Sequence, residues 1–138
     1  MRVLFDTDVM LDVLLRRQPF FDVAQSLFSR VEHGDLEGAA SATSITTVFY
    51  FARKSLGRAV ALQSIRLLLK LFRTAPVTHD ILAAALDLDF TDYEDAVLHE
   101  AARTAGVDGI VTRNTRDFRN SDLRVYTPKE LDEVLSAG

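Results

Sequence analysis

The stretch RVLFDTDV, residues 2–9, is a short, mainly apolar run followed at once by two aspartates with a threonine between them. Residues 2–5 are too few for a helix, and a short continuous apolar run is typical of a strand buried on both faces. Asp6 then stands at the carboxyl end of this strand. Ligands bind beyond that end in parallel sheets, so one segment indicates both a fold class and a site.

Helical and extended patterns alternate along the rest of the chain. The predicted helices have apolar residues at helical spacing, and Gly, Pro or capping residues separate them. They cover about residues 9–15, 19–33, 43–56, 58–72, 79–88, 93–105 and 128–137. Further strands are predicted at about 36–40, 76–77, 109–112 and 124–126. This alternation predicts an α/β fold with a parallel sheet that helices cover on both faces.

Capping residues mark where several of these helices begin. Asp, Ser and Thr side chains accept hydrogen bonds from the free N–H groups of a first helical turn. The expected N-caps are Asp8, Thr43 or Ser44, Asp92, and Thr127 with Pro128 and Glu130 in a capping box.

Composition limits the class of protein. The 138 residues are 48% hydrophobic, which is the size and character of one ordinary domain spanning 1–138. There is no cysteine, which excludes disulfides and thiolate metal sites. Asp6, Asp8 and Asp12 interrupt the first apolar run, so a signal peptide or membrane span is not expected there. A soluble cytoplasmic protein without a membrane partner is the simplest interpretation.

Charge is unevenly distributed over the chain. Residues 1–75 have a net charge of +3 and residues 76–138 of −7, within a total of −4. An acidic centre that binds metal ions, with basic groups at its rim that hold phosphates, would produce this pattern. Charges on a solvated surface would produce it equally well.

Three distant segments bring acidic groups to one edge of the predicted sheet. Asp6 follows the first strand, Asp117 lies in the loop after the strand at 109–112, and Asp95 lies in the first turn of a helix. Mg²⁺ and Mn²⁺ prefer such oxygen ligands, and these ions activate water for phosphodiester cleavage. Helix caps, the positive helix end and pairing of Asp117 with Arg113 or Arg116 are structural alternatives for the individual acids.

The order and spacing of five stretches give the chain a wider resemblance. They are VLFDTDVMLDVLLRR, SATSITTVFYFARK, DFTDYEDAVLHEAA, GVDGIVTRNTRDF and VYTPKEL. Together they resemble the PIN-domain family, in particular its bacterial toxin-type, VapC-like branch. This resemblance implies a three-layer α/β/α sandwich and an endoribonuclease that needs Mg²⁺ or Mn²⁺. It also implies a toxin of a type II toxin–antitoxin pair, often a homodimer, with RNA as substrate and a small antitoxin as partner.

The resemblance assigns roles to individual residues. Asp6 matches the first acidic ligand, Asp95 the acid of the later helix and Asp117 the acid after TRN, which makes them the expected catalytic and metal-binding residues. Asn114 stands where a polar residue commonly supports the site. Asp8 takes a place often held by Asn and is a further candidate ligand.

One position departs from the family pattern. The family usually has an acidic residue early in the third helix, and here that place falls on Thr47. A neutral hydroxyl lowers the negative charge that holds the cation, so metal affinity and activity are expected to fall. Asp8, Asp92 or Glu94 are the residues that could compensate.

Basic residues near these stretches are candidate contacts for RNA phosphates. The main candidates are Arg16, Arg17, Arg113 and Arg116, with Arg53, Lys54 and Arg119 as additional ones. For any one of them, a place on a solvated basic face is the alternative.

Two rival functions stay open at this point. Thr47 is compatible with a weakened PIN-fold module that binds RNA or protein without cutting. FDTDV after a short strand is also similar to the Asp-x-Asp start of haloacid-dehalogenase-type phosphatases, in which the first Asp is a nucleophile. That family needs a basic residue and paired acids after later strands, whereas residues 112–118 match the PIN pattern instead.

Overall fold

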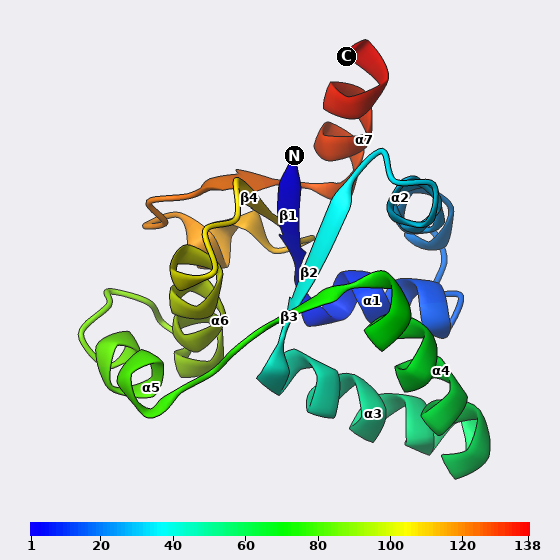
Figure 1. The fold of residues 1–138 in the computed structure, drawn as a ribbon, viewed down its shortest axis with the longest axis horizontal. Coiled ribbons are helices and arrows are strands. Elements are labelled where there is room, and N and C mark those ends of the chain that lie inside the picture. The colour runs from blue at the N-terminus through cyan, green and yellow to red at the C-terminus, as the bar shows by residue number, and fades with distance from the viewer.

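In the computed structural model, which describes residues 1–138, five parallel strands form one sheet with the order β3-β2-β1-β4-β5. The strand that begins the first quoted stretch lies at the centre of this sheet (Figure 1). The strands are β1 (Arg2–Phe5), β2 (Glu37–Ser41), β3 (Arg73–Ala75), β4 (Gly109–Val111) and β5 (Arg124–Tyr126).

Helices cover both faces of the sheet, which confirms the predicted α/β/α fold. On one face lie α1 (Thr7–Leu14), α2 (Phe21–Glu32), α3 (Ala42–Leu56), α4 (Arg58–Leu71) and α7 (Pro128–Ala137). On the other lie α5 (His79–Ala85), α6 (Tyr93–Thr104) and the short 3₁₀ helix η1 (Thr115–Phe118). Figure 1 shows α5 and α6 on the opposite side of the sheet from α1 to α4. No helix is both long and apolar enough to cross a membrane.

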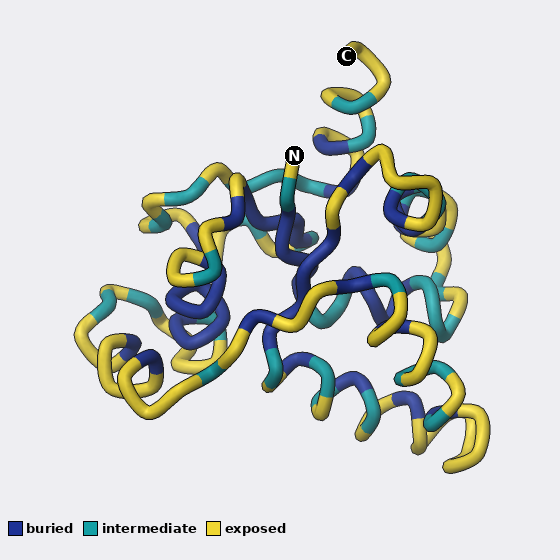
Figure 2. The backbone as a smooth tube through the Cα atoms, viewed as in Figure 1, coloured by how far each residue is buried: buried dark blue, intermediate teal, exposed yellow.

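Alternation along the strands creates two hydrophobic cores. Val3 and Phe5 of β1 point into the core under α1, α2 and α4, while Leu4 points into the core under α5 and α6. Successive side chains of a strand point to opposite faces, so one buried strand supplies both cores. The buried segments gather at β1, β2 and α6, and the outer turns of α4 and α5 are exposed (Figure 2).

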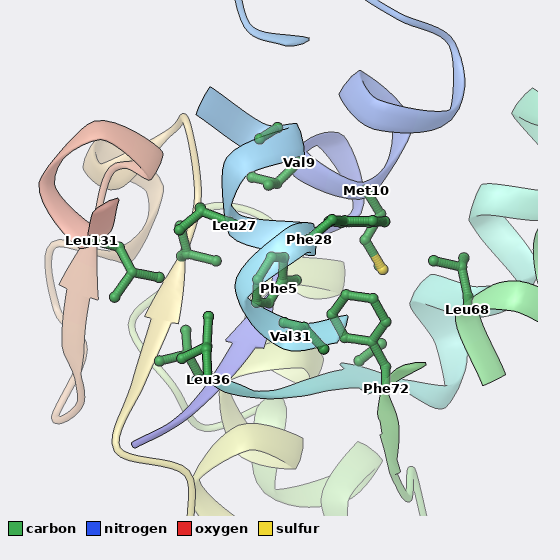
Figure 3. Packing of buried hydrophobic residues seen from close by; sticks show 14 of the residues in the cluster. Phe5, Val9, Met10, Leu27, Phe28, Val31, Leu36, Leu68, Phe72 and Leu131 are labelled. Carbon is green, nitrogen blue, oxygen red and sulfur yellow. The ribbon is translucent and has the colours of Figure 1, made fainter. Parts of the chain in front are cut away.

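Three aromatic rings fill the larger core. Phe5, Phe28 and Phe72 meet pairwise in edge-to-face contacts with ring centroids 5.0 to 5.9 Å apart (Figure 3). Gly38 of β2 lies under this group, because a Cβ atom there would come within 2.5 Å of the Phe72 ring. The close approach of a ring to the sheet therefore depends on a residue without a side chain.

Several predicted element boundaries were wrong. Asp6, not Asp8, is the N-cap of α1, since its side chain accepts from the N–H of Thr7. Ser41 caps α3, not Thr43 or Ser44, because it has the extended backbone that a cap residue needs. N-cap residues cannot be chosen from composition where several suitable side chains stand close together.

Two further segments begin elsewhere than predicted. Residues 18–20 form a turn, and α2 begins at Phe21 rather than at Pro19. The third strand is β3 and ends before Pro76, whereas the prediction placed it at residues 76–77. Proline has no N–H to donate to a neighbouring strand, which favours pairing before it. The caps Asp92 and Thr127, with its capping box to Glu130, are confirmed.

Candidate functional site

A cavity of about 350 Å³ opens at the carboxyl ends of the strands. In the sheet, β2 and β3 lie on one side of β1, and β4 and β5 lie on the other side. The strand order therefore reverses direction at β1, and the cavity lies at this point. Ligands of open α/β sheets usually bind at such a reversal. Only three of its 15 lining residues are hydrophobic, and six are acidic: Asp6, Asp8, Asp92, Glu94, Asp95 and Asp117.

Asp6 is the most firmly held of these acids. Its Oδ1 accepts a 2.8 Å hydrogen bond from the N–H of Thr7, and its Oδ2 accepts a 2.7 Å bond from the hydroxyl of Thr112. The side chain is buried, and burial raises the pKa of Asp6 while the two hydrogen bonds oppose that rise. Its orientation is therefore fixed by the end of β1 and by the end of β4 together.

Asp8 lies two residues further on, in the first turn of α1. Its Oδ2 accepts a 2.9 Å hydrogen bond from the side-chain amide of Asn114. Its Oδ1 is buried and has no hydrogen-bond partner. Burial, followed by the charge of Asp6, raises the pKa of Asp8 to about 6. An unpartnered buried carboxylate oxygen is costly unless a cation or proton satisfies it.

The amino end of α6 supplies the acids on the opposite wall of the cavity. Asp92 caps the helix by accepting from the N–H of Asp95 at 3.2 Å. Burial, and then the charges of Asp6 and Asp92, raise the pKa of Asp95 to about 7. Asp117 comes from η1 and is exposed to solvent, and its charge acts on both Asp6 and Asp95.

The wall formed by α3 is neutral. Thr43, Thr47 and Phe51 are four residues apart and share the helix face that lines the cavity. The hydroxyl of Thr47 donates to the carbonyl oxygen of Thr43 at 3.1 Å. The hydroxyl of Thr7 donates to that of Ser44 at 2.9 Å. Hydroxyl oxygens thus occupy the side of the cavity where the family pattern has an acid.

The basic candidates are not equivalent in the structure. Arg17 lines the cavity, while Arg16, Arg113 and Arg116 do not. Arg113 forms a two-pronged ion pair with Asp12, in which its Nε lies 2.7 Å from Oδ2 and its Nη2 lies 3.3 Å from Oδ1. The expected alternative pairing of Arg113 with Asp117 is therefore not formed. Arg116 is exposed and forms no ion pair.

Two residues of this region carried no role in the sequence-based prediction. Thr112 binds Asp6 and also accepts from the N–H of Asn114 at 3.0 Å. Asp12 is fully buried in α1. Thr112 could have been found as the hydroxyl residue at the carboxyl end of the predicted strand at 109–112. Asp12 could have been found as an acid on the apolar face of a helix, where an unpaired charge is rarely tolerated.

Strand order alone does not identify the family, because several doubly wound folds share it. The sequence itself matches a family model described as a PIN domain over residues 2–116. The chain belongs to the PIN-domain family. The family predicted from the five sequence stretches is thereby confirmed, and the haloacid-dehalogenase alternative has no support. No curated protein sequence matches this PIN domain significantly.

Solved structures share the fold over almost the whole chain. A toxin–antitoxin complex from Klebsiella pneumoniae has 25% identity and a TM-score of 0.70, covering 91% of this PIN domain and 97% of that chain. VapBC2 from Rickettsia felis, bound to a promoter DNA fragment, has 12% identity and a TM-score of 0.69, covering 92% and 98%. Mycobacterium tuberculosis VapC20, a Sarcin-Ricin loop cleaving toxin, has 14% identity and a TM-score of 0.64, covering 78% and 86%.

The oxygen donors of the cavity fit a divalent cation, although their present positions do not surround one point. No three His, Cys, Asp or Glu side chains of the PIN domain are arranged so that they could hold one ion. The donors are nevertheless hard oxygens, one of which, Oδ1 of Asp8, is buried without a partner. Burial raises the pKa values of Asp6, Asp8 and Asp95, and neighbouring carboxylates raise them further, while the charge of Arg113 opposes the rise at Asp6 and Asp8. A cation in the cavity would offset the excess of negative charge.

Proposed function

We propose that this PIN domain is a metal-dependent endoribonuclease and the toxin of a type II toxin–antitoxin pair. The observation that carries the proposal is the convergence of acids from β1, α6 and η1 on one cavity at the carboxyl edge of the sheet. Membership of the PIN family and the likeness to a toxin–antitoxin complex support the same function.

Asp6, Asp95 and Asp117 are the proposed ligands of one Mg²⁺ or Mn²⁺ ion, with Asp8 as an additional ligand. When bound, the ion would lower the pKa of water and stabilise charge on phosphate oxygens during phosphodiester cleavage. Asp6 is oriented for this task by Thr112 and by the first N–H group of α1.

The remaining residues of the cavity have supporting roles in this proposal. Arg17 is the basic residue that lines the cavity, and it is placed to contact an RNA phosphate beside the acids. Asp92 caps α6 and fixes the backbone of Asp95. Asn114 holds Asp8, while Glu94 adds negative charge at the rim.

The proposed biological setting follows from the same family membership. The chain of residues 1–138 would act as one PIN-like domain, since α7 packs on α2 although it lies beyond the matched residues. It would act in the cytoplasm, where RNA is the substrate, as a homodimer that an antitoxin inhibits. The structural likeness to a toxin–antitoxin complex supports the antitoxin as partner.

Cleavage of a structured RNA tests this function. Wild type would be compared with Asp95→Asn and with Asp87→Asn, an exposed aspartate outside the cavity, in Mn²⁺, in Mg²⁺ and with chelator. Metal-dependent cleavage by wild type and Asp87→Asn, lost in folded Asp95→Asn, is the expected result. Equal cleavage by all three proteins, or cleavage in chelator, would remove the proposed mechanism.

A weakened binding module is the second candidate. The observations in its favour are the neutral wall at Thr47 and the absence of three acids already arranged around one point. Such a protein would bind RNA or a partner without cutting. Retention of RNA by a folded wild type that shows no cleavage in either metal ion would decide for this candidate.

A further inference from the structure

A buried ion pair lies directly behind the acids of the cavity. Asp12 is 0% exposed, and the side chain of its partner Arg113 is 24% exposed. The guanidinium group of Arg113 also lies 3.9 Å from the centroid of the Phe20 ring. Two hydrogen bonds and a ring face thus hold one arginine in a single orientation.

These contacts occupy part of the guanidinium group of Arg113 that could otherwise recognise a phosphate. The edge formed by Nε and Nη2 faces Asp12, and one flat face is covered by Phe20. Arg113 does not line the cavity, whereas Arg17 does, with its Nη1 at 3.9 Å from Oδ1 of Asp12. The sequence predicted that Arg113 contacts RNA, but its guanidinium group faces Asp12 and lies outside the cavity.

The neighbours of Arg113 in the chain both hold acids of the cavity. Thr112 donates to Oδ2 of Asp6 at 2.7 Å, and the side-chain amide of Asn114 donates to Oδ2 of Asp8 at 2.9 Å. The N–H of Asn114 in turn donates to the hydroxyl of Thr112. Residues 112–114 consequently contact α1 and its N-cap Asp6 through three successive side chains.

The helix supplies matching positions for these contacts. Asp8 and Asp12 are four residues apart in α1 and so lie on the same face of that helix. The segment after β4 is attached to that face at Asp8 through a neutral hydrogen-bond donor and at Asp12 through a charge. The second attachment is the stronger one, because a two-pronged pair of opposite charges is stronger and more directional than a single hydrogen bond from an uncharged donor.

We propose that the Asp12–Arg113 ion pair is a positioning element, which fixes residues 112–114 against α1 and so places the carboxylates of Asp6 and Asp8 for a divalent cation. Arg113 acts through its neighbours and not by contact with RNA. This inference rests on the proposed metal site. Groups behind metal ligands commonly set metal affinity in this way, since they fix the orientation of each ligand.

Arg113→Lys tests the proposal without a change of charge. Lysine keeps the positive charge but cannot form the planar two-pronged pair. A matched control is Arg30→Lys, because Arg30 is 23% exposed and pairs with Asp132 at 3.1 Å between α2 and α7, away from the cavity. The two readouts are the Kd for Mn²⁺ from calorimetric titration with MnCl₂ and the amide hydrogen exchange of residues 112–114 in metal-free protein.

The expected result is a loss of about tenfold in Mn²⁺ affinity for Arg113→Lys, within the range for groups behind metal ligands. Exchange at residues 112–114 should also be faster, while Arg30→Lys changes neither readout. Unchanged affinity and unchanged exchange in a folded Arg113→Lys protein would overturn the proposal. If Arg113→Lys also lost RNA binding in chelator while both readouts stayed unchanged, the result would show that Arg113 contacts phosphate instead.

The experiment also decides in two less favourable cases. If Arg113→Lys is poorly folded, Asp12→Asn retains one acceptor for Arg113 and is expected to give the same faster exchange. If wild type binds no Mn²⁺, the proposed metal-dependent function fails. The exchange data then decide on their own whether the ion pair fixes residues 112–114, and protection equal to wild type refutes it.

Discussion

The hydroxyl group of Thr112 donates a 2.7 Å hydrogen bond to Oδ2 of Asp6, across 106 positions of sequence. Both groups are buried where β1 and β4 end side by side. The carboxylate at the centre of the site is thus held by the neighbouring strand as well as by its own helix. This relation makes the site depend on the pairing of the two strands.

Thr112→Val keeps the shape of the side chain and removes this hydrogen bond, together with the one that the hydroxyl accepts from the N–H of Asn114. We expect a loss of about 1.5–3 kcal/mol in the free energy of unfolding at neutral pH, because a buried carboxylate oxygen loses its donor. Urea unfolding measures the change. Thr46→Val is the control, since the exposed hydroxyl of Thr46 binds only a carbonyl oxygen of its own helix. An equal loss in both variants would contradict the importance of the Asp6 contact.

The metal-free protein should lose stability as the pH rises from about 4 to about 7. The pKa values of Asp8, at about 6, and Asp95, at about 7, are raised above the value near 4 of an unfolded chain. The folded state therefore binds protons that the unfolded state has released, and this contribution disappears as the pH passes the folded pKa. Urea midpoints in chelator across this range measure it.

Asp95→Asn provides the check on that pH dependence. Asparagine removes the titrating group, so the decline in stability between about pH 4 and about pH 7 should be smaller than in wild type. Mn²⁺ should restore the stability of wild type at the upper end of this range, because it binds the ionised carboxylates. A wild-type stability that increases steadily across the range would show that folding does not raise the pKa values of Asp8 and Asp95.

Thr47→Glu should strengthen metal binding. The side chain of residue 47 lines the cavity, so glutamate there adds a carboxylate to the neutral wall of α3. We expect the affinity for Mn²⁺ to rise by about tenfold or more, since ligand charge sets affinity at oxygen sites. The matched control is Thr46→Glu, which adds the same charge at an exposed position of α3 outside the cavity. Equal gains in both would indicate a general charge effect.

Gly109→Ala should destabilise the fold. A Cβ atom at residue 109 would lie 2.8 Å from the carbonyl oxygen of Arg124 in the neighbouring strand. We expect a cost of about 1–3 kcal/mol, typical of overpacking, which urea unfolding measures. Gly138→Ala is the control, because its nearest neighbour would be at 3.8 Å. A Gly109→Ala protein as stable as the control would mean that β4 and β5 can separate at little cost.

Local signals predicted much of the fold and the content of the site. The apolar run before Asp6, the cap at Asp92 and the capping box at Thr127 are patterns within a few residues, and the structure contains each of them. The predicted acids line one cavity because parallel strands bring their carboxyl ends to the same edge. Their roles as metal ligands stay predictions.

Errors arose where several residues competed for one role. Asp6 and Asp8 are both suitable caps for α1, and the choice depends on which has the extended backbone at the end of β1. The strand at β3 was misplaced because Pro76 and Val77 resemble an extended segment, while the actual pairing with β2 involves Arg73 to Ala75.

The sequence by itself determined the helices and strands, their order and the acids after β1 and β4. The spacing of apolar residues, the capping residues and the Gly and Pro residues that end helices all act over a few neighbouring positions. Only the tertiary structure decided which charges meet. Asp12 and Arg113 lie 101 positions apart, and their pairing follows from the contact of α1 with the segment after β4. An ion pair depends on distance and burial in three dimensions, and neither quantity can be inferred from the identity of the two residues.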